Sequence, residues 1–135
     1  MFRTIDSLRQ NKLITYKEKN NGTCIVSITR AGKKKVKEWD LEHMIIKKPV
    51  QWDKRWRIVT FDIREDKKKA RDALRRMLKR LGFYRLQRSV FVHPYSCRPE
   101  IEFLCSLYDL PERDVLYFST DRIPNELFLK KYFKI

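Results

Sequence analysis

The stretch WRIVTFDIREDKKKARDALRRMLKRLGFYRLQRSVFVH, residues 56–93, decides the fold of this chain. It opens with an apolar, β-branched run over Trp56–Ile63 that is typical of a strand. The next residues are typical of an amphipathic helix over Asp66–Leu81, and Gly82 stands where a helix C-cap belongs. The predicted buried stripe of this helix is Ala70, Leu74, Met77, Leu78 and Leu81. Two short strands, FYRLQ and SVFVH, complete the stretch.

The same alternation of strand and helix continues downstream. CRPEIEFLCSLYDL predicts a second helix, and DVLYFST predicts a fourth strand. The order βαββαβ is that of an α+β, ferredoxin-like domain, in which a four-stranded antiparallel sheet carries both helices on one face. We therefore expect this domain over residues 54–120. NELFLKKYFKI then forms a final short helix or tail within residues 121–135.

The segment upstream of the domain has a different pattern. Phe2, Ile5 and Leu8 recur every three residues and predict a short helix. Two strands, about 13–19 and 23–29, flank the turn sequence NNG, and a second helix follows up to a linker marked by Pro49. Residues 1–48 thus resemble the C-terminal half of a winged-helix domain, whose wing touches the DNA backbone. A packing appendage or a dimerisation arm is the alternative interpretation.

The overall charge favours a polyanionic partner. The 135 residues include 32 Lys and Arg against 17 Asp and Glu, which gives a formal net charge of +15. Such an excess repels itself in a compact protein unless a counter-charge is bound. Nucleic acid is the partner that we expect, with double-stranded DNA as the specific prediction, whereas a merely soluble basic protein or a membrane-surface binder is the alternative.

Other classes of site find little support. Cys24, Cys97 and Cys105 form no Cys-x-x-Cys pair, and His43 and His93 fit no zinc-ligand spacing. Neither a signal peptide nor a membrane-spanning run is visible, so we expect a reducing, cytoplasmic location. With no nucleophile set and no phosphate-binding glycine loop, a metal-bound carboxylate is almost the only catalytic option.

The predicted phosphate contacts centre on the helix over residues 66–81. It carries eight Lys and Arg side chains against Asp66 and Asp72. A solvated helix face is the common explanation of such a run, but eight nearly unopposed cations would repel one another without phosphates. The predicted nucleic-acid-binding residues are Lys67, Lys68, Arg71, Arg75, Arg76, Lys79, Arg85, Arg88, Lys33 and Lys34. Phosphate contacts carry no sequence information, so base specificity and the choice between DNA and RNA stay open.

Asp62 ends the first strand of the domain. Alternation places Val59, Phe61 and Ile63 on one face of the sheet and Ile58, Thr60 and Asp62 on the other. If the helices cover the first face, the second is open to a symmetry-related copy, and two Asp62 carboxylates could then share a divalent cation. The predicted dimer interface consists of Ile58, Thr60, Gln87, Ser89 and Phe91. The simpler alternative is that Asp62 accepts hydrogen bonds at the strand end or helps to cap the helix.

Several separated motifs of the domain resemble those of the small CRISPR spacer-acquisition protein, the Cas-two family. They are the strand ending in Phe61 and Asp62, then Arg71, then Leu81 and Gly82, and then Gln-x-Ser-Val-Phe at residues 87–91. The resemblance covers roughly residues 56–120. It implies a ferredoxin-like homodimer that binds DNA as a scaffold between CRISPR integrase subunits. It also implies Asp62 as the candidate catalytic residue of a metal-dependent endonuclease, with Mg²⁺ at the dimer interface.

The same stretch also resembles the central domain of the phenylacetate-catabolism repressors, the PaaX-like family, which joins a winged helix to a Cas-two-like domain. Residues 13–36 fit the wing of that family, although Arg64 stands where the repressors usually have Pro. This second resemblance implies a transcriptional regulator without catalysis. A scaffold with or without nuclease activity and a regulator are therefore the competing hypotheses.

Overall fold

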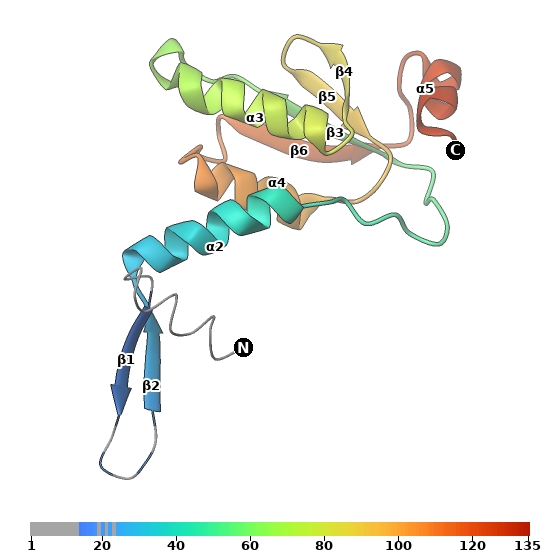
Figure 1. The fold of residues 1–135 in the computed structure, drawn as a ribbon. Coiled ribbons are helices and arrows are strands. Elements are labelled where there is room, and N and C mark those ends of the chain that lie inside the picture. Colours follow the sequence, from blue (N-terminus) through green and yellow to red (C-terminus); the bar gives the residue numbers. More distant parts are fainter. Residues whose placement is uncertain (1–13, 19, 21, 23) are drawn as a thin grey trace. The chain divides into compact units, whose positions relative to one another are not determined.

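The computed structural model describes residues 14–18, 20, 22 and 24–135 of the chain (Figure 1). The chain divides between Met44 and Ile45 into two compact units. The helix predicted around Phe2, Ile5 and Leu8 lies outside the described residues.

The first unit contains the predicted hairpin and the helix that follows it. Strands β1 (Ile14–Glu18) and β2 (Cys24–Ile28) pair antiparallel, with Ile14 opposite Ile28. Helix α2 (Arg30–His43) begins after Thr29, whose Oγ1 accepts a hydrogen bond of 3.0 Å from the N–H of Gly32. This cap satisfies one of the free amides at the helix start. The hairpin and helix are confirmed, whereas a winged helix stays a prediction.

The second unit has the predicted βαββαβ order and belongs to the α+β class (Figure 1). Its sheet has the strand order β4-β5-β3-β6 with every neighbouring pair antiparallel, which is compatible with a ferredoxin-like fold. The elements are β3 (Trp56–Phe61), the 3₁₀ turn η1 (Glu65–Lys67), α3 (Lys68–Arg80), β4 (Tyr84–Gln87), β5 (Val90–His93), α4 (Arg98–Leu107), β6 (Val115–Thr120) and α5 (Glu126–Phe133).

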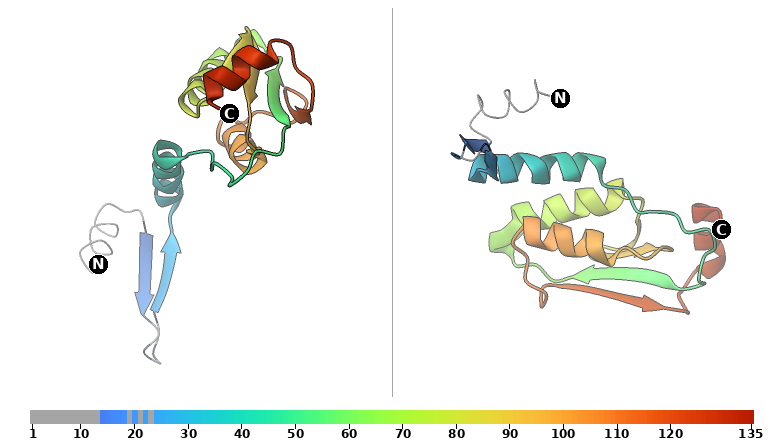
Figure 2. Two further views of the ribbon diagram at one scale, coloured as in Figure 1. Left: turned by 90° about the vertical axis from the view of Figure 1, so that its right-hand side faces the viewer. Right: turned by 90° about the horizontal axis from the view of Figure 1, so that it is seen from below.

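Helices α3 and α4 lie side by side on one face of this sheet (Figure 2). The sheet side chains beneath them are those of the predicted set, and Phe61 stacks on Phe91 with ring centroids 5.9 Å apart. Leu74, Leu78 and Leu104 from the two helices are fully buried. The predicted stripe of α3 is therefore its core side, with Ala70 half-buried at its margin.

Gly82 ends α3 as predicted. Its φ of +96° is a left-handed conformation that glycine adopts without steric penalty, and its N–H donates to the carbonyl of Lys79. The chain can therefore turn at once into β4.

Helix α5 covers part of the opposite face of the sheet. Leu129 is fully buried in a cluster with Trp56, Ile58 and Val92. Residues 121–135 are therefore more than a tail, because their apolar side chains form a second, smaller core on the sheet. Among the helices of the described residues, none is long and apolar enough to cross a membrane.

Candidate nucleic-acid interface

The cations of α3 and η1 form what we call the α3 basic surface. The apolar stripe of α3 faces the sheet, and charged side chains occupy most of its other positions. Asp72 is the only carboxylate within the helix. Lys68, Arg76 and Lys79 are exposed, and Lys67 is half-buried with its Nζ 3.3 Å from the carbonyl oxygen of Asp109. The members of the α3 basic surface are Lys67, Lys68, Lys69, Arg71, Arg75, Arg76, Lys79 and Arg80.

Arg71 and Arg75 differ from the other members because they are partly buried. Their side chains are 17% and 22% exposed. Arg71 pairs with Glu65 at 3.1 Å, and Arg75 lies 3.6 Å from Asp72. Since the two arginines are four residues apart, they lie on one side of the helix, next to its core stripe.

Arg85 on β4 and Arg88 in the β4–β5 turn extend the positive charge to the sheet edge. Both side chains are exposed. Burial and the charges of Arg71, Arg85 and Arg88 together hold the pKa of Arg75 below its usual value. The structure therefore brings these four predicted residues into one electrostatic neighbourhood.

Lys33 and Lys34 belong to a different part of the chain. Both are exposed on α2, in the first unit. We predicted that they extend the basic surface of the domain. This stays a prediction, because the two lysines belong to the other unit.

Asp62 follows β3 directly and its side chain is exposed. Its backbone N–H donates to the carbonyl oxygen of Asp114 at 2.9 Å, which continues the pairing of β3 with β6 beyond the last ladder residue. In the described part of the chain, no three His, Cys, Asp or Glu side chains gather closely enough to bind a metal ion. Asp62 therefore belongs to no such group among the described residues of one chain, and an Mg²⁺ site shared by two Asp62 carboxylates of a dimer stays a prediction.

The structure corrects the expectation of an open sheet face. Ile58 is 7% exposed because α5 packs over it, and Phe91 is 3% exposed because it faces the helices together with Val59 and Phe61. These two residues therefore have little surface to offer a second copy. Thr60 and Ser89 are half-buried and Gln87 is exposed, so for these three an interface role stays a prediction.

The part of this face nearest Asp62 remains uncovered. Leu116, opposite Thr60, is 57% exposed, and Phe118, opposite Ile58, is 46% exposed. Neither residue was among the predicted interface set. The alternation of β6 alone would have placed both on the face opposite the helices.

Buried titratable groups do not form a nucleophilic site. Burial raises the pKa of the Cys97 thiol to about 12 and lowers the pKa of His93 to about 4. The thiol is thus protonated and the imidazole neutral at pH 7, and both lie within the packed interior. Neither residue is a candidate for catalysis.

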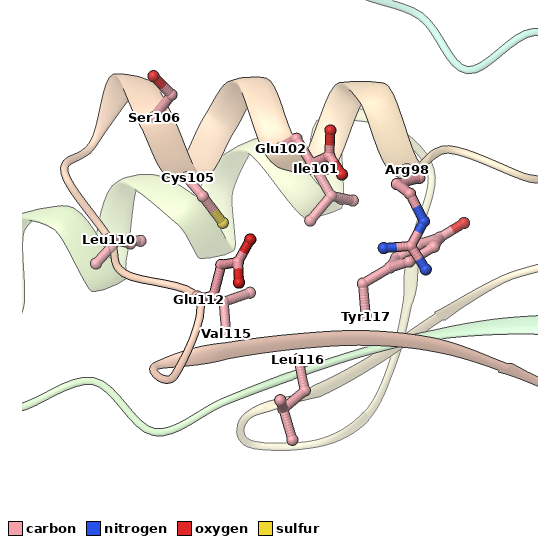
Figure 3. A pocket seen from close by; sticks show the side chains of 10 residues that line it. All are labelled: Arg98, Ile101, Glu102, Cys105, Ser106, Leu110, Glu112, Val115, Leu116 and Tyr117. Atoms are coloured by element: carbon pink, nitrogen blue, oxygen red, sulfur yellow. The ribbon is translucent and has the colours of Figure 1, made fainter.

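A pocket of about 490 Å³ lies between α4 and β6 (Figure 3). Ile101 and Val115 contribute apolar lining, and the guanidinium of Arg98 lies 4.9 Å from the ring centre of Tyr117. Glu102 and Glu112 bring negative charge to the same pocket. Because these carboxylates would repel phosphates, the pocket does not extend the basic surface.

Fold and charge together define the class of protein: an α+β, ferredoxin-like domain whose first helix presents a cationic surface. Residues 49–126, more than half of the chain, match the family model of the PaaX protein central Cas2-like domain, and the chain belongs to this family. The comparison with curated proteins gave no match. The match begins before β3, includes β6 and stops at Glu126, the first residue of α5. Almost all of α5, the helix that packs on the face of the sheet opposite α3 and α4, therefore lies outside the match.

Proposed function

We propose that this protein binds double-stranded DNA as a transcriptional regulator of the PaaX type, without catalysis, and that the α3 basic surface contacts the phosphates. The family match supports a role of the PaaX type, because the matched model is the PaaX protein central Cas2-like domain; its Cas2-like character is also compatible with a scaffold. The resemblance of the upstream hairpin to a wing supports it as well.

The observation that carries the proposal is the charge of the α3 basic surface. Its eight cations lie on α3 and η1, which together contain three carboxylates, Glu65, Asp66 and Asp72. Binding to phosphates would release the counterions that otherwise accompany these charges, which is a favourable and salt-dependent contribution. Contacts of this kind fix a protein on the duplex, while base recognition would require another element, for which the first unit is the candidate.

Fluorescence anisotropy with a labelled duplex tests the proposal. The double variant Arg76→Gln/Lys79→Gln removes two exposed charges of the α3 basic surface. We expect weaker binding and a plot of log K against log salt whose slope falls by about 2, since each phosphate contact contributes about 0.9. The matched control is Lys131→Gln/Lys134→Gln, which removes the same charge from exposed residues in and just after α5. Equal losses in both variants would mean that net charge, and no particular surface, binds the DNA.

A Cas2-like scaffold with nuclease activity is the second candidate function, favoured by the exposure of Asp62 at the end of β3. In that case a homodimer would bring two Asp62 carboxylates together around Mg²⁺, and a CRISPR integrase subunit would be a partner. Cleavage of duplex DNA in Mg²⁺ should then be lost in Asp62→Asn and retained in Asp66→Asn, which alters another exposed carboxylate nearby. Cleavage that survives Asp62→Asn rules out this role.

A further inference from the structure

Arg75 lies at the corner where the β4–β5 turn approaches α3, and Arg71, Arg85 and Arg88 are near enough for their charges to act on it. Nη2 of Arg75 lies 3.5 Å from Oγ of Ser89, and Ser89 follows Arg88 directly in the turn. The carbonyl of Ser89 in turn accepts a hydrogen bond of 3.1 Å from the N–H of Phe61, which ties the turn to the end of β3. We call Arg71, Arg75, Arg85 and Arg88, together with Ser89, the arginine corner.

The inner half of the arginine corner is held in place by packing. The guanidinium carbon of Arg75 lies 5.5 Å from the ring centre of Phe61, which itself stacks on Phe91. Nη1 of Arg71 is 3.4 Å from the carbonyl oxygen of Ile63 and 3.1 Å from the carboxylate of Glu65. Both guanidiniums are therefore oriented by neighbours from β3 and η1, which limits the entropy that a ligand would have to remove.

The charges in the arginine corner are incompletely compensated. The carboxylates that pair with its arginines are Glu65, which is 78% exposed, and Asp72, at the longer distance of 3.6 Å. Among the residues that the structure describes, Nε of Arg71 and Nε of Arg75 are both closed to solvent without a hydrogen-bond acceptor. Burial and, after it, the like charges of Arg71, Arg85 and Arg88 depress the pKa of Arg75. Like charges that are only partly compensated repel one another more strongly where water is partly excluded, and an anion bound beside these guanidiniums would reduce that repulsion.

We propose that the arginine corner is a discrete oxyanion site that binds one tetrahedral phosphate group, which a nucleic-acid backbone supplies in the function proposed above. Guanidinium groups suit this ligand because their planar donors pair with two phosphate oxygens at once. The hydroxyl of Ser89 adds a neutral donor. The exposed lysines of α3 differ in kind, since they would contact phosphates as mobile point charges without a fixed geometry.

Inorganic phosphate is the probe, compared with chloride at the same ionic strength by isothermal titration calorimetry and thermal unfolding of the whole chain. Wild-type protein should bind phosphate saturably and show a higher Tm in phosphate than in chloride. Arg75→Gln should weaken phosphate binding by about 10-fold or more, as expected for the loss of a charge-assisted hydrogen bond. Arg122→Gln is the matched control, because it removes the same charge from an exposed residue between β6 and α5, outside the α3 basic surface and the arginine corner. It should keep the phosphate affinity.

Two further measurements distinguish a failure of the arginine corner from a failure of the proposed DNA binding. Arg88→Gln alters an exposed turn residue and serves where Arg75→Gln fails to fold by circular dichroism; it too should weaken phosphate binding. Duplex binding, measured on the same variants, tests the proposed function independently. Phosphate binding without duplex binding would support the corner and reject nucleic acid as its source. Equal effects of phosphate and chloride, or equal losses in Arg75→Gln and Arg122→Gln, would overturn the arginine corner and leave DNA binding intact.

Discussion

Replacing Leu129 by Ala should destabilise the second unit, because this side chain joins α5 to the sheet. Leu129 is fully buried against Trp56, Ile58 and Val92. Leu→Ala changes in cores cost about 2–5 kcal/mol, and the value rises with the cavity that remains. Since α5 has only eight residues, we expect its neighbours to close part of the cavity. We therefore expect a loss of about 3 kcal/mol, which lowers Tm by about 10–20 °C in a domain of this size.

Leu127→Ala is the matched control on the same helix, because Leu127 is 79% exposed. It should change the free energy of unfolding by less than about 0.5 kcal/mol. Urea unfolding followed by tryptophan fluorescence measures both variants, since Trp56 is fully buried in the same cluster and Trp52 contacts it edge-on at 5.0 Å. A loss below about 1 kcal/mol for Leu129→Ala, equal to that of Leu127→Ala, would refute the packing of α5 on the sheet.

Two further predictions concern buried polar groups. Because burial lowers the pKa of His93 to about 4 while the unfolded chain keeps about 6.5, the unfolded state binds the extra proton between these values. The free energy of unfolding is therefore highest above pH 6.5 and falls as the pH is lowered towards 4, with a loss of about 2 kcal/mol between pH 7 and pH 5. Urea titrations across this range should show the dependence in wild type and a weaker one in His93→Gln; identical slopes contradict the assignment. Asp53→Asn should destabilise by about 1–3 kcal/mol, because the buried Arg57 loses its bidentate carboxylate partner at 2.6 and 2.8 Å. Lys54→Gln, an exposed neighbour, is the control in thermal unfolding, and equal stability of the two variants contradicts this role.

Local patterns were sufficient for the elements of the second unit. The spacing of Leu74, Met77, Leu78 and Leu81 predicts the buried face of a helix, and Gly82 predicts its end. Both features depend only on residues close together in the sequence. The strand order of the sheet followed from the βαββαβ succession, because short connections and antiparallel pairing leave few arrangements. The same local reasoning identified the cations of α3 other than Lys69 and Arg80 as candidate contacts.

The packing of α5 could not be predicted in this way. Its apolar residues are spread around the helix, so the sequence offered two sides for burial. The structure buries Leu129 and leaves Leu127 and Phe128 exposed. That choice depends on Trp56 and Val92, which lie far away in the chain, and it explains why Ile58 seemed available for a dimer interface.

The charge, the class of fold and the cationic helix could all be predicted from the sequence, because each depends on residue types and on periodicities of two or 3.6 residues. Which of these charges lie near one another depends on tertiary packing. Arg71 and Arg75 are one helical turn apart, whereas Arg85 and Arg88 belong to β4 and the β4–β5 turn. Burial and the charges of Arg71, Arg85 and Arg88 together lower the pKa of Arg75, whose guanidinium lies beside Phe61. A run of like charges therefore becomes a defined site only where packing removes water from some of its members.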